Sequence, residues 1–283
     1  MFKSRLLKNI VICIMFVFIF SGSSMMSYAD EVREKEPNDT METAELIMAN
    51  HDSAAQAVSG KHEDENVVYG DTSKTDTDWY KVYLTAGTQY VICNGDSYRF
   101  DVYDSNGNFI TGQVYKKAPL GSTAHPFTAT TDGMYYVKIT GIMSSSTSYI
   151  LLVGDPVYTV ASCKVNLTTV TMANNRNGLS TFNISTENVL PDGAIVYMMA
   201  VRNVRNLDVT NISVRNLSSN NTVNLDKYSW NKSGLVNLNM PLKSNWSITY
   251  EYKKDVSFTP SIELYYAYPV VSTYVQDDIE ITP

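Results

Sequence analysis

Cysteine is nearly absent from this 283-residue sequence. It occurs three times, and because Cys13 lies in an N-terminal apolar run, only Cys93 and Cys163 remain for the rest of the chain. Two cysteines are too few for a disulfide framework. They lie in opposite halves of the chain, so they form either one bridge between two domains or two separately buried thiols. Cys93 stands in an apolar strand candidate, which favours burial over reactivity.

Histidine is scarce as well, and recognisable catalytic motifs are missing. The three histidines are His51, His62 and His125, and none belongs to a Gly-x-Ser-x-Gly elbow or a His-Glu-x-x-His zinc helix. We interpret all three as surface residues, with His125 in a loop before Pro126. A hydrolase needs an activated nucleophile and a base that reaches it. We therefore predict that the protein is not an enzyme. The open alternative is a secreted hydrolase with a carboxylate active site in the C-terminal half.

Long apolar runs are limited to one, Ile10 to Phe20, which follows a start containing three basic residues. This run has about half of the roughly 20 residues that a membrane-spanning helix needs. Small residues follow it as far as Ser27-Tyr28-Ala29, the pattern that signal peptidase cleaves. We predict a secretory signal peptide at 1–29, a secreted or cell-surface location, and no membrane insertion of the mature chain.

No excess of basic residues follows the signal peptide. Residues 30–155 contain 19 acidic and 9 basic side chains, a net charge of −10 (9 − 19), whereas residues 156–283 contain 10 of each. An acidic half disfavours nucleic acid and anionic lipid as partners. The change in composition near Gly154-Asp155-Pro156 predicts a boundary between two domains, 30–155 and 156–283.

No segment shows the period of a long helix, and only Met41 to Ala49 favours a short one. The remaining pattern is of short β-strands separated by turn residues. Asp78 to Leu84 and Trp246 to Tyr252 alternate between two faces, as half-buried strands do. Asn106-Gly107 between two apolar segments predicts a hairpin. We predict an all-β fold of two β-sandwich domains.

Four groups of residues stand in a fixed order in the first half. They are Glu34-Lys35-Glu36-Pro37-Asn38-Asp39-Thr40, then Gly70-Asp71 with Asp76-Thr77-Asp78-Trp79-Tyr80, then Val102-Tyr103-Asp104-Ser105-Asn106-Gly107, and last Gly133-Met134-Tyr135-Tyr136-Val137 with Tyr149-Ile150-Leu151-Leu152-Val153. In this order they resemble the bacterial pre-peptidase C-terminal domain family, which is related to the collagen-binding domain of clostridial collagenases. The resemblance implies a jelly-roll-like β-sandwich for residues 30–155. It does not extend to residues 156–283, which we expect to form an unassigned β-sandwich.

The acidic stretch and the turn before Trp79 contain many hard oxygen ligands. Calcium takes six to eight such oxygens, mostly from carboxylates and carbonyls. In calcium-binding members of the family these two segments hold the metal, so the resemblance implies a Ca²⁺ site here. The ligand candidates are Glu34, Glu36, Asn38, Asp39, Asp76 and Asp78, with Asp71 as a further one. The alternative is a solvated acidic linker that binds no ion.

Collagen is a weaker inference than calcium. In the collagenase modules, aromatic residues on the strand after the Gly-x-Tyr-Tyr landmark contact the triple helix. The corresponding stretch, Ile139 to Ile142, contains no aromatic residue, which argues against collagen. We interpret the tyrosine-rich strands 246–252 and 265–268 as structural, with an aromatic binding face as the alternative.

From these features we predict a non-catalytic binding or accessory protein. Its partner is expected to be an extracellular protein or polysaccharide. An inhibitor or folding helper of a secreted peptidase is a further alternative.

Overall fold

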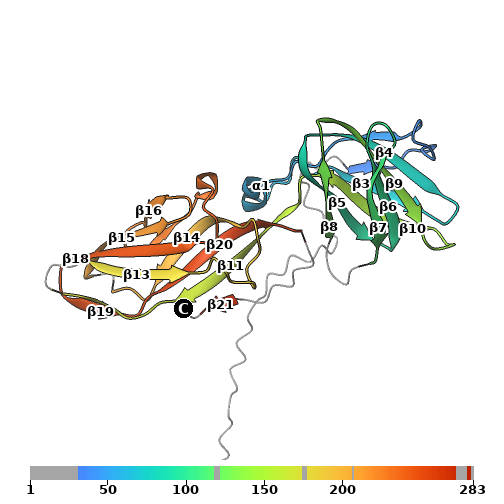
Figure 1. Cartoon of the computed structure of the whole chain (residues 1–283). Helices are drawn as coiled ribbons and strands as arrows, with labels where there is room; N and C mark the ends of the chain where they lie inside the picture. The colour runs from blue at the N-terminus through green and yellow to red at the C-terminus, as the bar shows by residue number, and fades with distance from the viewer. Residues whose placement is uncertain (1–30, 118–121, 174–176, 206, 272–278, 282–283) are drawn as a thin grey trace, which may run out of the picture.

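A computed structural model describes residues 31–117, 122–173, 177–205, 207–271 and 279–281. The predicted signal peptide at 1–29 lies outside these residues. Almost every regular element is a β-strand, arranged in two bodies with separate hydrophobic cores (Figure 1). The predicted all-β sandwich fold is confirmed. No helix among the described residues has the length and apolar character to cross a membrane.

The first sandwich is built from two five-stranded sheets. Its strands are β1 (Glu31–Arg33), β2 (Glu45–Ile47), β3 (Val67–Thr72), β4 (Thr77–Leu84), β5 (Gly87–Gly95), β6 (Tyr98–Tyr103), β7 (Phe109–Tyr115), β8 (Thr123–Ala129), β9 (Gly133–Gly141) and β10 (Thr147–Gly154). The sheet orders are β1-β3-β10-β5-β8 and β2-β4-β9-β6-β7. We call the second of these the β4–β9 sheet.

The topology of this sandwich is that of a jelly roll. Counted along the chain from β3, one sheet contains the first, eighth, third and sixth strands, and the other contains the second, seventh, fourth and fifth. A jelly roll has this eight-strand arrangement of two Greek keys. The short strands β1 and β2 add in parallel to β3 and β4. The expected jelly-roll-like sandwich is therefore present.

Alternation along the strands sends one set of side chains into the core. On β4, Tyr80, Val82 and Leu84 are buried, while the residues between them point outward. The hairpin predicted around Asn106-Gly107 joins β6 to β7. Gly107 has a φ of 78°, which suits glycine at this turn.

The second sandwich comprises a five-stranded sheet, a four-stranded sheet and a two-stranded ribbon. Its strands are β11 (Tyr158–Asn166), β12 (Val170–Met172), β13 (Gly178–Asn183), β14 (Ile195–Arg202), β15 (Val209–Asn216), β16 (Thr222–Asn224), β17 (Asn231–Lys232), β18 (Asn245–Tyr252), β19 (Val256–Phe258), β20 (Ser261–Pro269) and β21 (Ile279–Ile281), with a 3₁₀ turn η1 (Val236–Leu238). The sheet orders are β17-β14-β20-β11-β21 and β13-β18-β15-β16, and β12 pairs with β19.

The aromatic strands of this half mainly build its core. Trp246, Ile248 and Tyr250 are fully buried on one face of β18, as the alternation predicted. Tyr266 and Tyr268 are also buried, from β20. The structural interpretation of these strands is confirmed for these residues.

The predicted helix at Met41 to Ala49 is wrong. A turn at 41–43 leads into β2, because Glu45–Ile47 pairs in parallel with β4 and this pairing overrides a weak local preference. The helix of this region is α1 (Ala54–Ser59), which has clear local signals. The Ser53 side chain caps it by accepting the Gln56 N–H, and Gly60 ends it in the left-handed conformation.

The structure also decides the expectations about the two cysteines and about the segment with His125 and Pro126. Cys93 and Cys163 are free, buried thiols in different cores, so they do not form the interdomain bridge. His125 and Pro126 lie in β8 rather than in a loop. Proline is tolerated there because β8 is the edge strand of its sheet.

Candidate metal centre

The segment between β1 and β2 crosses from one sheet of the first sandwich to the other. The backbone N–H of Glu34 donates to the carbonyl oxygen of Tyr69 on β3 at 3.0 Å. Four residues later, the carbonyl oxygen of Asn38 accepts the N–H of Trp79 on β4 at 2.9 Å. These two bonds hold residues 34–38 over the beginning of β4, where Asp78 faces the interior.

This crossing brings five of the six predicted ligands together. The carboxylates of Glu34, Glu36 and Asp78 have oxygen atoms that all lie within 4.8 Å of one another. Glu36, Asp39 and Asp76 form a second such group. Glu36 belongs to both groups, so the five carboxylates form one continuous cluster, which we call the acidic cluster. The predicted convergence of the two acidic segments is what the structure shows.

Asn38 and Asp78 are fully buried at this cluster. Each is 0% exposed, and neither side chain makes a hydrogen bond of normal geometry among the described residues, although Glu34 and Tyr149 lie close enough to Asp78 to affect its pKa. A buried polar group without a partner costs free energy, and a buried unpaired carboxylate costs far more. A cation beside Asp78 would remove this cost.

Asp71 was the further ligand candidate, but its carboxylate does not join the acidic cluster. Its backbone N–H donates to Glu34 Oε2 at 2.8 Å, whereas its own carboxylate accepts the Ser148 hydroxyl at 2.6 Å. It belongs to neither carboxylate group. Asp71 therefore positions Glu34 through the backbone.

The electrostatics of the cluster oppose full ionisation in the absence of a cation. Burial, followed by the charge of Glu34, raises the pKa of Asp78 to about 8. Burial also raises the pKa of Glu34, and burial and the charge of Glu36 raise that of Asp76. No ion pair among the described residues includes a member of the cluster, and the neighbouring Lys35 pairs with Glu45 at 3.8 Å. Like charges held this close favour either protonation or a bound cation.

The glycine landmark has a direct physical role. A β-carbon on Gly70 would overlap the ring of Tyr149 and the Glu34 carboxylate. The Tyr149 hydroxyl in turn meets that of Tyr80 at 2.5 Å in the buried interior. Glycine at position 70 therefore leaves the space in which Glu34 reaches the cluster. Sequence reasoning noted this glycine as a landmark but missed its contact with Glu34, which the pairing of β1 with β3 reveals.

Paired carboxylates also occur in glycosidases, but this arrangement suits a metal better. Glycosidase carboxylates flank a sugar that must reach both of them. Both oxygens of Asp78 are inaccessible to solvent, so no sugar reaches it. All the ligands are oxygens, with no imidazole or thiolate in either group, which favours calcium over zinc.

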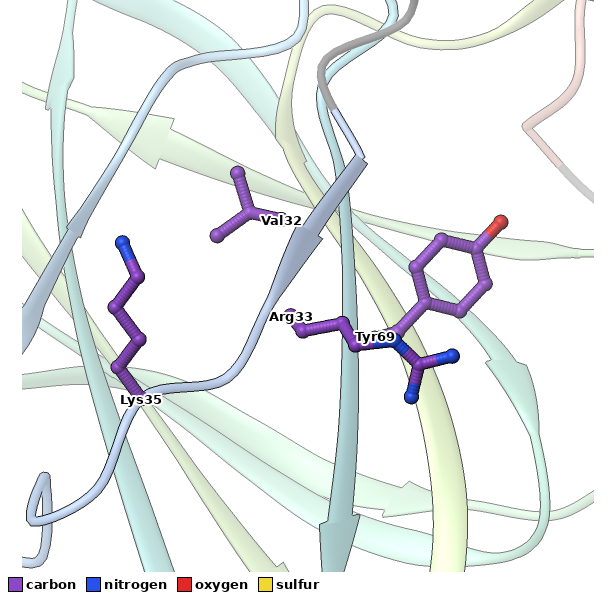
Figure 2. Close-up of a pocket in the computed structure, with 4 residues that line it drawn as sticks. All are labelled: Val32, Arg33, Lys35 and Tyr69. Atoms are coloured by element: carbon purple, nitrogen blue, oxygen red, sulfur yellow. The ribbon is translucent and has the colours of Figure 1, made fainter.

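A surface hollow of about 650 Å³ lies at a different place, beside β1 (Figure 2). Val32, Arg33 and Lys35 line it together with Tyr69 of β3. Among the described residues, its lining contains two cationic groups and no carboxylate. It therefore offers no carboxylate pair of the kind that a glycosidase uses.

Only one of the three histidines is a well-exposed surface residue as predicted. His51 pairs with Asp155 at 3.1 Å and is 60% exposed in its side chain. His62 is half-buried, 3.4 Å from the Asp52 carboxylate and 3.5 Å from that of Glu65. In the sequence, the three-residue spacing of His62 and Glu65 could have indicated this contact.

His125 is also half-buried, because it packs against Phe100 with ring centroids 5.0 Å apart. Burial lowers its pKa. His62 and His125 are therefore partly exposed rather than free surface residues. Each is held by packing or pairing within the first sandwich.

Comparisons with known proteins identify no family for this chain. No family model matches the chain, and no curated protein matches it. Among solved structures, it is similar to a candidate secreted protein from Eubacterium rectale, with 10% identity, a TM-score of 0.49 and 88% of each chain covered. It is also similar to a triple-jelly-roll protein of an archaeal virus, with 15% identity, a TM-score of 0.26, and 70% of this chain and 56% of the other covered. A third is the PBSX exported protein XepA, with 9% identity, a TM-score of 0.23 and coverages of 70% and 84%.

Proposed function

We propose that this protein works outside the cytoplasm as a non-catalytic binding or accessory protein, and that calcium bound at the acidic cluster stabilises its first sandwich. The observation that carries the calcium proposal is the fully buried Asp78, which has a carboxylate oxygen within 4.8 Å of those of Glu34 and Glu36 and no cationic partner among the described residues. The predicted signal peptide supports an extracellular location, where calcium is plentiful. Its partner is an extracellular protein or polysaccharide.

The residues fit calcium in number and kind. Calcium takes six to eight oxygens in flexible geometry, whereas magnesium demands a near-ideal octahedron and retains water. Glu34, Glu36, Asp39, Asp76 and Asp78 supply the carboxylate oxygens, and Asn38 supplies a buried amide oxygen. Calcium bound there offsets two of the negative charges of the cluster and ties residues 34–39 to β4. The resemblance to pre-peptidase C-terminal domains points to the same two segments.

A non-catalytic role agrees with the state of the nucleophiles. Burial raises the pKa of both Cys93 and Cys163 to about 12. A thiol with such a pKa remains protonated and is a poor nucleophile. The carboxyl group of Asp78, whose pKa is raised to about 8, belongs to the acidic cluster, where a bound metal accounts for its burial.

Isothermal titration calorimetry tests the proposal on the chain from Asp30, after removal of metal by a chelator. We expect saturable binding of Ca²⁺, much weaker binding of Mg²⁺, and loss of the calcium signal in Asp78→Ala. The matched control is Glu63→Gln, which removes an exposed carboxylate of the same sandwich and should bind calcium normally. Absence of calcium binding by the folded chain would refute the calcium site.

A further inference from the structure

The outer face of the β4–β9 sheet carries a continuous row of side chains. On each strand the alternate residues fill the core, so the others point away from it. The strand register places Lys81 opposite Tyr136, Tyr136 opposite Tyr103, and Tyr103 opposite Phe109. Residues directly opposite each other in neighbouring strands have adjacent side chains. The row therefore runs across four strands, β4, β9, β6 and β7.

Five aromatic side chains gather on this outer face. They are Trp79, Tyr83, Tyr103, Phe109 and Tyr136, which we call the aromatic face. Tyr83 is 58% exposed and Phe109 is 57% exposed. Three of these rings are in contact: Trp79 and Tyr103 have centroids 5.2 Å apart, and Tyr103 and Phe109 have centroids 5.8 Å apart.

The core of the sandwich does not require these rings. The inner face of the same sheet already contributes Tyr80, Phe100, Val102 and Val137 to the interior. Single exposed apolar residues are ordinary, but a contiguous group on one face marks an interaction site. Aromatic residues in particular are favoured at binding surfaces because they supply contact area at a low entropy cost.

The charge of this face is opposite to that of the surrounding domain. The outward charged side chains on its four strands are Lys81, Lys138, Arg99 and Asp101. Arg99 forms a two-bonded pair with Asp101, at 3.0 and 2.6 Å, and Lys138 lies 5.7 Å from the centre of the Trp79 ring. The face therefore has a net charge of +2 (3 − 1), on a half of the chain with a net charge of −10. This contrast favours an anionic partner.

We propose that the aromatic face binds an anionic polysaccharide, an inference that rests on the proposed role as an extracellular binding protein. The apolar faces of pyranose rings pack on Tyr136, Tyr103 and Phe109, while the acidic groups of the polymer pair with Lys81 and Lys138. Neighbouring strands are about 4.8 Å apart, a spacing similar to the length that one sugar ring adds to a glycan. An extended glycan thus fits along the row.

Nucleic acid shares part of this chemistry, since it also combines stacking rings with negative charge. Its charge density is much higher, and binding relies on many cationic contacts. On the aromatic face Arg99 is paired with Asp101, which leaves Lys81 and Lys138 as the cationic groups for a ligand. The protein as a whole has a net charge of −7. The observations therefore favour a more sparsely charged polymer.

Titration of the chain from Asp30 with polygalacturonate and with hyaluronate oligosaccharides tests this proposal. Trp79 fluorescence and calorimetry both report on the face. We expect saturable binding to at least one of these polymers and a loss of about tenfold or more in affinity for Tyr136→Ala and Phe109→Ala, as for other aromatic stacking platforms. Lys138→Gln should weaken binding less and reduce its dependence on salt.

Three comparisons make the outcome decisive. Tyr228→Ala removes an exposed tyrosine of the second sandwich and should bind as the unaltered chain does. Polyglutamate tests charge without sugar rings, and neutral dextran tests sugar rings without charge; both should bind much more weakly. Equal binding of polyglutamate or single-stranded DNA would overturn the proposal, as would binding that survives both aromatic substitutions. Collagen-peptide binding that both substitutions abolish would also overturn it in favour of a protein partner.

The calcium response is measured on the same samples. Tyr136→Ala and Phe109→Ala lie outside the acidic cluster and should retain calcium binding, which also shows that they fold. If calcium binds and neither polymer does, the glycan inference fails while the proposed calcium site stands. If calcium does not bind, the calcium proposal fails independently of the glycan result.

Discussion

The Asp52 carboxylate accepts a hydrogen bond from the backbone N–H of Tyr158 at 2.7 Å, which links the first sandwich to the first strand of the second. Asp52 is 3% exposed. Beside it, the Asn50 and Asp155 backbones bond at 2.8 Å, and α1 packs against β11 and β20 (Figure 1). Residues 50–60 therefore brace the connection between the two sandwiches.

Removal of the Asp52 side chain should weaken this connection. Asp52→Ala leaves the Tyr158 N–H without its partner, and we expect a loss of about 1–3 kcal/mol in the free energy of unfolding. Proteolysis near residues 155–158 should also become faster. Urea unfolding and limited proteolysis measure the two effects, with Glu63→Ala, which removes an exposed carboxylate nearby, as the control. Unchanged behaviour of Asp52→Ala in both assays would contradict the bracing role.

The same region predicts a pH dependence. A hydrogen bond and the charge of Asp52 raise the pKa of His62 above 6.5, so the protonated imidazole is favoured in the folded state. Its stabilising contribution is complete below pH 6.5 and is lost as the pH rises through the folded-state pKa. The free energy of unfolding should therefore fall over this range, and His62→Gln should flatten that part of the profile. Burial is the chief cause that raises the pKa of Glu65. Its contribution to stability is therefore also lost as the pH rises, beginning above the ordinary Glu pKa of 4.5. A profile identical in the unaltered chain and His62→Gln would rule out the pairing.

Asp78→Asn should have opposite effects with and without calcium. Because burial raises the pKa of Asp78 to about 8, the charged form is unfavourable in the metal-free protein at pH 8.5. The neutral amide avoids that cost, so in a chelator the variant should be at least as stable as the unaltered chain. Calcium should not stabilise this variant, because the substitution removes a negatively charged ligand of the metal. Thermal unfolding at pH 8.5 measures both, and a variant that is less stable in the chelator yet still responds to calcium would argue against the site.

Both free thiols should be protected from reagents in the native protein. Cys93 and Cys163 are buried, with pKa values raised to about 12. We expect a maleimide to label neither thiol under native conditions and both after unfolding in guanidinium. Mass spectrometry counts the labels on the chain from Asp30. Rapid native labelling of either thiol would contradict its burial.

The sequence predicted the sandwich architecture well because strand signals are local. The alternation around Tyr80 and Trp246, and the Asn106-Gly107 turn, define faces and hairpins without knowledge of the rest of the chain. The acidic cluster was also predicted, since the resemblance linked residues 34–39 to the turn at 76–78. What remained hidden was the full burial of Asn38 and Asp78, which depends on the crossing of this segment between two sheets.

Other features could not be predicted because they depend on long-range pairing. The segment at 45–47 became a strand because β4 offered it a partner, although its local pattern favoured a helix. The aromatic face combines residues from four strands, and no single strand shows more than two of its rings. The contact between Asp52 and Tyr158 likewise joins residues more than one hundred positions apart.

Thermal unfolding in millimolar calcium and in EDTA tests the calcium claim most directly. A ligand that binds only the native state adds about 2.7 kcal/mol of stability at 100 times its dissociation constant. We predict a clear rise in Tm with calcium for the chain from Asp30, and no rise for Glu36→Ala or Asp78→Ala. An equal Tm in calcium and EDTA for the unaltered chain would contradict the account and leave the acidic cluster without a metal-binding role.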